Sequence, residues 1–118
     1  MGSRWYTLVV AAQDPARLAR WWGEVLDYKV MYEAPDEVVL AKGDDHHPGL
    51  VFVLVDDPKN GKNRLHIDLN PDDQAAEVER LVDMGARYVD VGQAPDASWV
   101  VLADPEGNEF CVLAARDQ

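Results

Sequence analysis

The side chains best suited to chemistry lie on two short segments of the chain. His66 and Asp68 are two residues apart in segment 64–70 (Arg-Leu-His-Ile-Asp-Leu-Asn), and Glu109 opens a second apolar run at 109–113. An imidazole beside a carboxylate can hold a divalent metal ion or move protons as an acid–base pair. We therefore hypothesise that His66 and Glu109 meet and form the functional site, as metal ligands or as a catalytic pair.

Segment 64–70 alternates between two unlike sets of side chains. The aliphatic set is Leu65, Ile67 and Leu69, and the ionisable set is Arg64, His66 and Asp68. A period of two predicts a β-strand whose aliphatic face lies on a core. Burying three ionisable groups without partners costs free energy, so we expect the other face to line a wet cavity.

Neighbouring side chains leave several alternatives open. Without a metal, His66 is expected to hydrogen-bond to Glu109 or to Asp68, and such a pair can still do acid–base work. Cys111 shares the face of Glu109 and is either a packing thiol or a nucleophile. A third metal ligand would come from His46 or His47 in the loop at 43–49, which are otherwise solvated, or from Asp68, which is two residues from His66 on the same face.

Four residues are candidates for contact with a small-molecule ligand. Trp5 and Trp99 lie at positions predicted to face the cavity, where they either stack on a planar ligand or pack in the core. Arg64 either binds an anionic group or reaches solvent, and Asp68 is a further polar contact. The sequence contains no phosphate-binding loop, zinc-finger spacing or nucleophile elbow.

Length and charge limit the class of protein. The chain has 118 residues, 47% of them hydrophobic, and a formal net charge of −11. These values predict one globular domain. An acidic chain lacks the basic face that nucleic acid requires, so we expect no nucleic-acid partner. The charge would attract a cationic small molecule, although an ordinary acidic surface explains it equally.

Cysteine content and hydropathy predict a cytoplasmic protein. Cys111 is the only cysteine, so no intramolecular disulfide can form, which fits a reducing compartment. No apolar run approaches the ~18 residues of a membrane span, so we expect no membrane partner. The N-terminal residues show no signal-peptide cleavage pattern.

The first half of the chain is typical of a strand, a helix and three strands. Asp14 and Pro15 are the expected N-cap and first residue of the helix. The apolar stripe of this helix comprises Leu18, Trp21, Trp22, Val25 and Leu26. The strands are predicted at 5–12, 29–33, 37–42 and 50–55, with the last one central or buried on both sides.

The second half repeats this order. After the strand at 64–70, the run Asn-Pro-Asp-Asp at 70–73 supplies a cap, a proline and an acidic first turn to a helix ending near Met84. Gly85 is the expected left-handed residue after the helix. Further strands are predicted at 87–91, 98–103 and 109–113.

The two halves therefore predict an α+β fold of two βαβββ modules, at 4–57 and 63–115, within one domain at 4–115. The tetrapeptide Val-Val-Leu-Ala occurs at 38–41 and again at 100–103. An offset of 59 residues aligns Thr7 with His66 and Leu50 with Glu109. Sequence identity between the halves is low, so the repeat is inferred from element order and this tetrapeptide.

Three segments make the chain similar to the vicinal oxygen chelate superfamily (glyoxalase, bleomycin resistance and dioxygenase), in particular to short glyoxalase-like proteins of actinobacterial type. They are Asp-Pro-Ala-Arg-Leu-Ala-Arg-Trp-Trp at 14–22, Leu-His-Ile-Asp-Leu at 65–69 and Asp-Pro-Glu-Gly-Asn-Glu-Phe at 104–110. The resemblance implies paired modules forming a curved mixed sheet around a cavity, and a homodimer. An open curved sheet has edges to cover, which also favours a dimer.

The resemblance places four metal positions at Thr7, Leu50, His66 and Glu109. Leu50 cannot ligate and Thr7 is a weak ligand, so His66 and Glu109 would hold the ion, which would be Mn²⁺, Mg²⁺, Ni²⁺ or Zn²⁺. The implied function is then a metal-dependent lyase, isomerase or dioxygenase acting at His66 and Glu109. If the site is degenerate, no metal binds, and the alternative is a drug-binding protein of the bleomycin-resistance kind.

Overall fold

The chain folds as two compact units, which the computed structural model describes at residues 2–61, 63–90 and 96–116. The units are Met1–Pro58 and Lys59–Gln118. Each contains one strand, one helix and three further strands in that order, so the predicted pair of βαβββ modules is confirmed. We call the units module one and module two.

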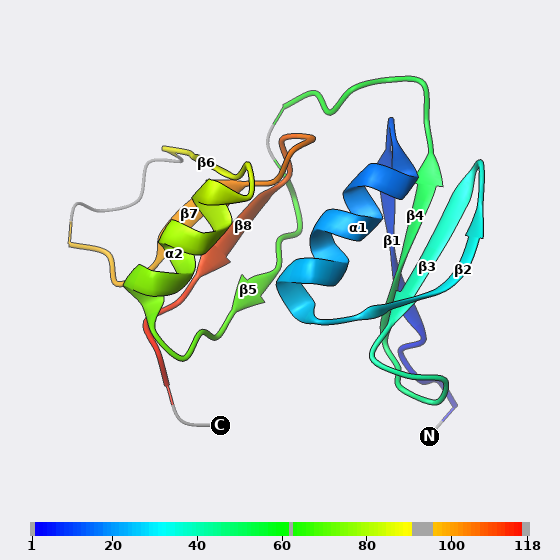
Figure 1. Cartoon of the computed structure of the whole chain (residues 1–118), viewed down its shortest axis with the longest axis horizontal. Helices are drawn as coiled ribbons and strands as arrows, with labels where there is room; N and C mark the ends of the chain where they lie inside the picture. Colours follow the sequence, from blue (N-terminus) through cyan, green and yellow to red (C-terminus); the bar gives the residue numbers. More distant parts are fainter. Residues whose placement is uncertain (1, 62, 91–95, 117–118) are drawn as a thin grey trace. The chain divides into compact units, whose positions relative to one another are not determined.

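Module one is a four-stranded sheet with one helix on it. Its elements are β1 (Thr7–Ala12), α1 (Pro15–Leu26), β2 (Lys29–Ala34), β3 (Glu37–Ala41) and β4 (Gly49–Leu54). The strand order is β1-β4-β3-β2, with β1 parallel to β4 and the other pairs antiparallel. Figure 1 shows α1 lying across one face of this sheet. The strand predicted at 50–55 is therefore central.

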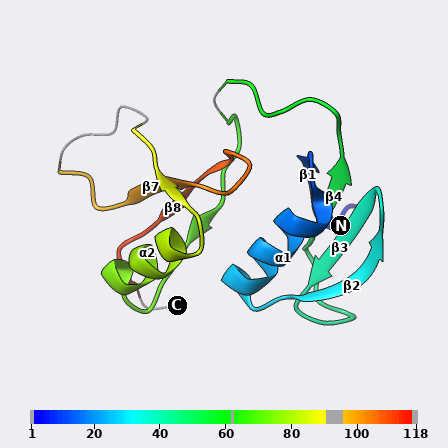
Figure 2. The ribbon, with the colours of Figure 1, turned by 45° about the horizontal axis from the view of Figure 1, so that its top comes forward.

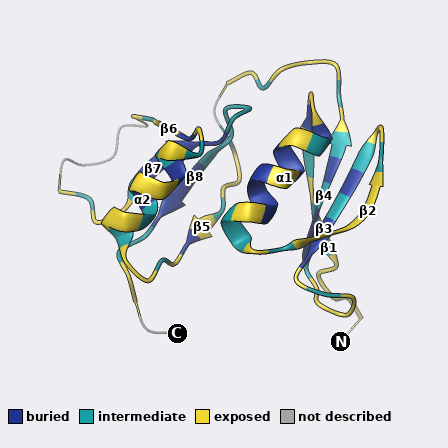
Figure 3. Cartoon of the chain, in the orientation of Figure 1, coloured by how far each residue is buried: buried dark blue, intermediate teal, exposed yellow. Residues whose placement is uncertain are grey.

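Helix α1 forms where the sequence predicts it. Asp14 caps its N-terminus, with the side-chain Oδ1 accepting a hydrogen bond from Arg17 N at 3.2 Å. Leu18, Trp21 and Trp22 are buried, and the two indole rings meet edge-to-face at 5.1 Å. Figure 3 shows buried residues, in dark blue, alternating with exposed ones along α1.

Module two has the same topology with shorter elements. They are β5 (Asp68–Leu69), α2 (Gln74–Asp83), β6 (Arg87–Tyr88), β7 (Val100–Ala103) and β8 (Glu109–Val112). The strand order is β5-β8-β7-β6, with β5 parallel to β8. Figure 2 shows α2 beside the sheet formed by β7 and β8. Among the described residues, no helix is both long and apolar enough to cross a membrane.

Two expectations about module two are wrong in detail. The strand predicted at 64–70 is limited to Asp68–Leu69, the two residues that pair with Cys111 and Val112 of β8. The cap of α2 is Asp73 and not Asn70, with Asp73 Oδ1 accepting from Ala76 N at 3.1 Å. The side chain of Asn70 instead bonds to the backbone of Arg116.

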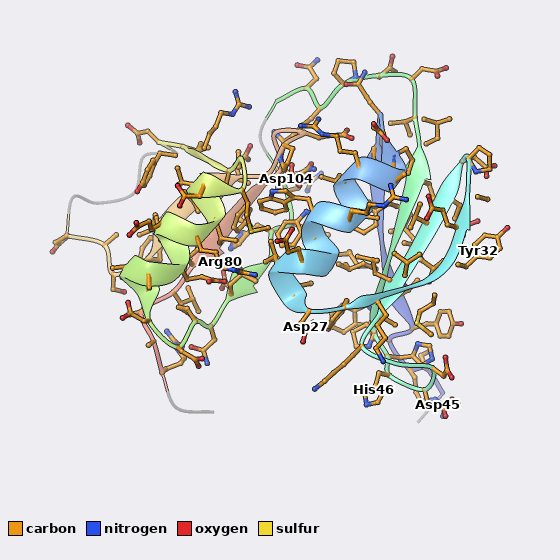
Figure 4. All side chains as sticks on the ribbon, in the orientation of Figure 1. Asp27, Tyr32, Asp45, His46, Arg80 and Asp104 are labelled. Atoms are coloured by element: carbon orange, nitrogen blue, oxygen red, sulfur yellow. The ribbon has the colours of Figure 1, made fainter. Side chains whose placement is uncertain are left out.

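The turn before β8 is built around a buried carboxylate. Asp104 Oδ1 accepts from the backbone N–H groups of Glu106 and Asn108 at 2.9 and 3.0 Å, and Oδ2 accepts from Asn108 Nδ2 at 2.9 Å. These bonds offset the cost of burying the charge. Gly107 takes a φ of +89°, which a residue with a Cβ adopts only with strain. Figure 4 labels Asp104, whose turn fixes where β8 starts and thus where Glu109 lies.

We predict that Trp22→Ala lowers the free energy of unfolding by about 3–5 kcal/mol, because truncating a buried aromatic side chain leaves a cavity. Trp22 is 4% exposed, whereas Trp5 is 68% exposed and makes a matched control. Trp5→Ala should change stability by less than about 0.5 kcal/mol. Urea unfolding followed by circular dichroism measures both, and a loss below about 1 kcal/mol for Trp22→Ala would contradict the assigned helix face.

Candidate functional site

The site begins with a contact between His66 and Asp68. His66 Nε2 lies 2.9 Å from Asp68 Oδ1. An ionised carboxylate only accepts hydrogen bonds, so Nε2 carries the hydrogen and Nδ1 keeps a free lone pair in the neutral imidazole. Both side chains are 50% exposed. The pair is thus formed within module two and is open to solvent.

Cys111 adds a thiol to this pair. The parallel pairing of β5 and β8 sets Asp68 beside Cys111, and Cys111 N donates to Ile67 O at 2.9 Å. One ligand atom from each of His66, Asp68 and Cys111 lies within 4.8 Å of the others. Burial first, and then the charge of Asp68 and a hydrogen bond to it, raise the pKa of Cys111. The thiol therefore keeps its proton, which argues against its use as a nucleophile in the metal-free state.

The carboxylate of Glu109 is satisfied by residues that the sequence did not single out. Its Oε2 lies 2.9 Å from Lys59 Nζ, and its Oε1 accepts from Asn63 N at 3.0 Å. Asn63 Nδ2 also donates to the backbone O of Glu109 at 2.9 Å. The side chains of Lys59 and Glu109 are only 20% and 15% exposed. Lys59 therefore supplies, from within the chain, the positive charge that a metal ion would bring to Glu109.

The residue pairing between strands corrects one of the four metal positions that the family resemblance implies. In module two Asp68 pairs with Cys111, whereas the equivalent Val9 in module one pairs with Val51. The counterpart of Glu109 is therefore Gly49, and the alignment of Leu50 with Glu109 is off by one residue. No side chain fits at this position, because a Cβ on Gly49 would lie 2.6 Å from Leu40 O.

The remaining family position is Thr7, at the start of β1. Its Oγ1 is buried and has no hydrogen-bond partner among the described residues, so it could still accept a ligand. Three of these positions, each considered by itself, are poorly suited to hold a metal ion. Gly49 offers no side chain, Thr7 is a weak ligand, and a metal at Glu109 would have to displace Lys59.

The other candidate residues lie away from any core. Trp5 and Trp99 are 68% and 40% exposed, so neither packs as a core residue, and Arg64 is exposed. His47 stacks on Tyr6 with ring centroids 4.5 Å apart. His46 lies in the loop between β3 and β4, where Figure 4 labels it. Of the predicted ligand contacts, Asp68 lies next to His66 within module two.

Sequence reasoning missed Lys59 and Asn63. Both lie in module two, in the segment before β5, where polar residues of a loop are ordinarily solvated. The available signal was Glu109 itself: a carboxylate predicted to face inward requires a donor or a cation nearby. In the structure, Lys59 and Asn63 provide the cation and the donor. The sequence alone does not show which residues of a loop turn inward.

Comparison with solved structures places this fold among known proteins. A glyoxalase/bleomycin resistance protein/dioxygenase family enzyme from Burkholderia phytofirmans PsJN is 16% identical, with 93% of this chain and 97% of that chain covered and a TM-score of 0.70. The trypanothione-dependent glyoxalase I of Leishmania major is 16% identical, with 96% and 87% covered and a TM-score of 0.69. At such identities the likeness shows the fold alone.

A third similar structure is a binding protein. The bleomycin-binding protein from bleomycin-producing Streptomyces verticillus, complexed with copper(II)-bleomycin, is 16% identical, with 98% of this chain and 99% of that chain covered and a TM-score of 0.59. A search of curated protein sequences gave no match.

Paired βαβββ modules with these neighbours define the glyoxalase/bleomycin resistance/dioxygenase superfamily fold. The sequence profile of the glyoxalase-like domain matches residues 7–113, which is nearly the whole chain. The chain therefore belongs to the glyoxalase-like domain family. This superfamily includes enzymes and bleomycin-binding proteins, so membership does not decide between catalysis and binding.

We predict that Cys111 makes stability fall at alkaline pH. Because folding raises the pKa of Cys111, the unfolded chain loses the thiol proton at a lower pH than the folded chain does. The stabilising contribution is present below the unfolded-state pKa and is lost as pH rises through the folded-state pKa.

Urea unfolding across the alkaline range, with reductant and chelator present, tests this expectation. The wild type should lose more stability than Cys111→Ser, and Asp68→Asn should reduce the difference by removing the charge beside the thiol. Glu33→Gln changes a carboxylate in module one and is the matched control. Parallel curves for the wild type and Cys111→Ser would contradict the shift.

Proposed function

We propose that this chain is a small-molecule-binding protein whose ligand is held at the His66–Asp68 pair. The observation that carries this proposal is that the carboxylates of Glu109 and Asp68 differ in their partners and in their exposure. Glu109 is paired with Lys59, whereas Asp68 is half exposed and contacts His66 and Cys111. The carboxylate of Asp68 and the Nδ1 lone pair of His66 are therefore the groups that we propose for holding the ligand.

The charge of this site favours a cationic or neutral ligand over an anionic one. The Lys59–Glu109 pair contributes no net charge, so the carboxylate of Asp68 dominates near His66. The net charge of −11 acts in the same direction at longer range. The exposed rings of Trp5 and Trp99 are proposed as further contacts for a planar ligand, and Arg64 for an anionic group on it.

One observation favours a second candidate, an enzyme that moves a proton. Asp68 accepts from Nε2 and so orients the imidazole of His66, which leaves Nδ1 as a base for a substrate proton. In this candidate Asp68 is the positioning residue, and Glu109 stays a structural carboxylate unless a metal displaces Lys59. A family-type centre at His66, Glu109 and Thr7, with Mn²⁺, Mg²⁺, Ni²⁺ or Zn²⁺, requires that displacement.

We also propose a cytoplasmic homodimer. The single cysteine supports a reducing compartment, and each four-stranded sheet has two edges that a second copy can cover. Val30 and Tyr32 on edge strand β2 are exposed apolar side chains of the kind that dimers bury. Light scattering at tens of micromolar should give twice the chain mass, and a monomer mass would contradict the proposal.

The binding proposal is tested with chelator present, so that no metal contributes. The probes are bleomycin and a size-matched panel of aromatic cations, neutral molecules and anions, with binding followed by calorimetry. Cations or neutral molecules should bind, and Asp68→Asn and His66→Ala should each weaken binding by about tenfold. Glu33→Gln, a carboxylate change in module one, should have no effect.

Two outcomes would overturn the proposal. In the first, only anions bind. In the second, the probes bind as well to Asp68→Asn and His66→Ala as to the wild type, which would place the ligand elsewhere on the chain.

A further inference from the structure

The three side chains of His66, Asp68 and Cys111, here called the His–Asp–Cys cluster, offer a nitrogen, an oxygen and a sulfur to one point. We infer that this cluster binds one thiophilic divalent cation of the Zn²⁺ kind per chain. This site differs from the family positions because it shares only His66 with them, and its other ligands come from Asp68 and Cys111.

The distances suit such an ion. Zn²⁺ takes sulfur at about 2.3 Å and nitrogen or oxygen at about 2.0–2.2 Å, so its tetrahedral ligands lie roughly 3–4 Å apart. The three ligand atoms of the cluster already lie within 4.8 Å of one another, and the nitrogen and oxygen are 2.9 Å apart. His66 and Asp68 are half exposed, so their side chains can rotate slightly to close the site.

The backbone holds the cluster together. Asp68 and Cys111 are paired residues of the parallel strands β5 and β8, and the bond from Cys111 N to Ile67 O fixes this register. His66 lies two residues before Asp68 and its side chain reaches the same carboxylate. Two of the three ligands are therefore positioned by strand pairing and the third by an existing side-chain contact.

Charge favours the cluster over Glu109 as the place for a cation. Glu109 already has the ammonium group of Lys59 at 2.9 Å and a backbone donor from Asn63. A metal ion there would have to displace an ammonium group whose side chain is only 20% exposed. Among the described residues, no lysine or arginine forms an ion pair with Asp68. A metal ion that binds at the cluster therefore displaces no cationic side chain.

Binding replaces the S–H bond of Cys111 with a sulfur–metal bond, and the thiol proton leaves to solvent. The hydrogen on His66 Nε2 is lost to solvent as Nδ1 takes one up, so that the neutral imidazole ligates through Nε2. Three protein ligands leave the fourth tetrahedral position open to water or to a ligand. The inference is independent of the proposed function, because the binding test above is made in chelator. A failed ligand-binding test therefore says nothing against metal binding, and a failed metal titration says nothing against ligand binding.

The experiment is a titration of reduced, tag-free protein with Co²⁺, followed by absorption spectroscopy. Because Cys111 is the only cysteine in the chain, a thiolate-to-cobalt charge-transfer band in the near ultraviolet reports on it alone. The band should saturate at one Co²⁺ per chain, and Zn²⁺ should then abolish it. The wild type alone gives this result, so the test does not depend on a variant that folds.

Variants then separate the cluster from the family positions. Cys111→Ser should abolish the band, and His66→Ala and Asp68→Asn should each weaken Co²⁺ binding by about tenfold or more. Glu109→Gln is the matched control, and it should keep the band with its affinity within about twofold. Circular dichroism checks that each variant is folded.

Three outcomes would overturn the inference. The first is the absence of a band at saturating Co²⁺ in the wild type. The second is saturation at one Co²⁺ per two chains, which would place the ion between copies. The third is that Glu109→Gln loses the band while Asp68→Asn keeps it, which would mean that the metal binds at the positions implied by the family.

Discussion

Parallel pairing of the first and last strand of each module is the constraint on which the rest of this structure depends. In module two, β5 and β8 are separated in sequence by a helix and two strands, yet Asp68 and Cys111 are paired residues. A parallel connection needs a crossover, and α2 supplies it while covering one face of the sheet. The opposite face then carries His66, Asp68 and Cys111 together.

The two carboxylates on this face of module two, Glu109 and Asp68, differ in whether a cationic side chain compensates their charge. Lys59 neutralises Glu109, with both side chains largely shielded from solvent, while Asp68 keeps its charge beside an imidazole. A buried pair of opposite charges is costly to break, because removing one partner leaves the other uncompensated. This difference is why we propose the neighbouring paired residues of β5 and β8, and not Glu109, as the place where a ligand or a metal ion binds.

Module one has the same topology with different residues at these positions. Its register equivalent of Glu109 is Gly49, where the close approach of Leu40 O leaves no room for a side chain. Thr7 keeps a buried hydroxyl with no partner in the described structure. Because a fold only provides positions, the chemistry of this family member follows from the residues that occupy them.

Local pattern in the sequence determined the secondary structure and the module order. Asp14 and Pro15 start α1, Leu18 and Trp22 give its buried stripe, and Gly85 takes the left-handed conformation after α2. These features depend on residues within a turn or two of each other, so periodicity and capping rules predict them. The alternation of segment 64–70 likewise predicted that His66 and Asp68 lie on the same face.

Only the tertiary structure decided which distant residues meet. The sequence could not show that Lys59 and Asn63 turn back to Glu109, because a loop has no periodicity that sets the direction of its side chains. A one-residue difference in register, which makes Gly49 and not Leu50 the equivalent of Glu109, depends on strand pairing across the sheet. Sequence thus determined the residues that can do chemistry, and long-range pairing decided which of them act together.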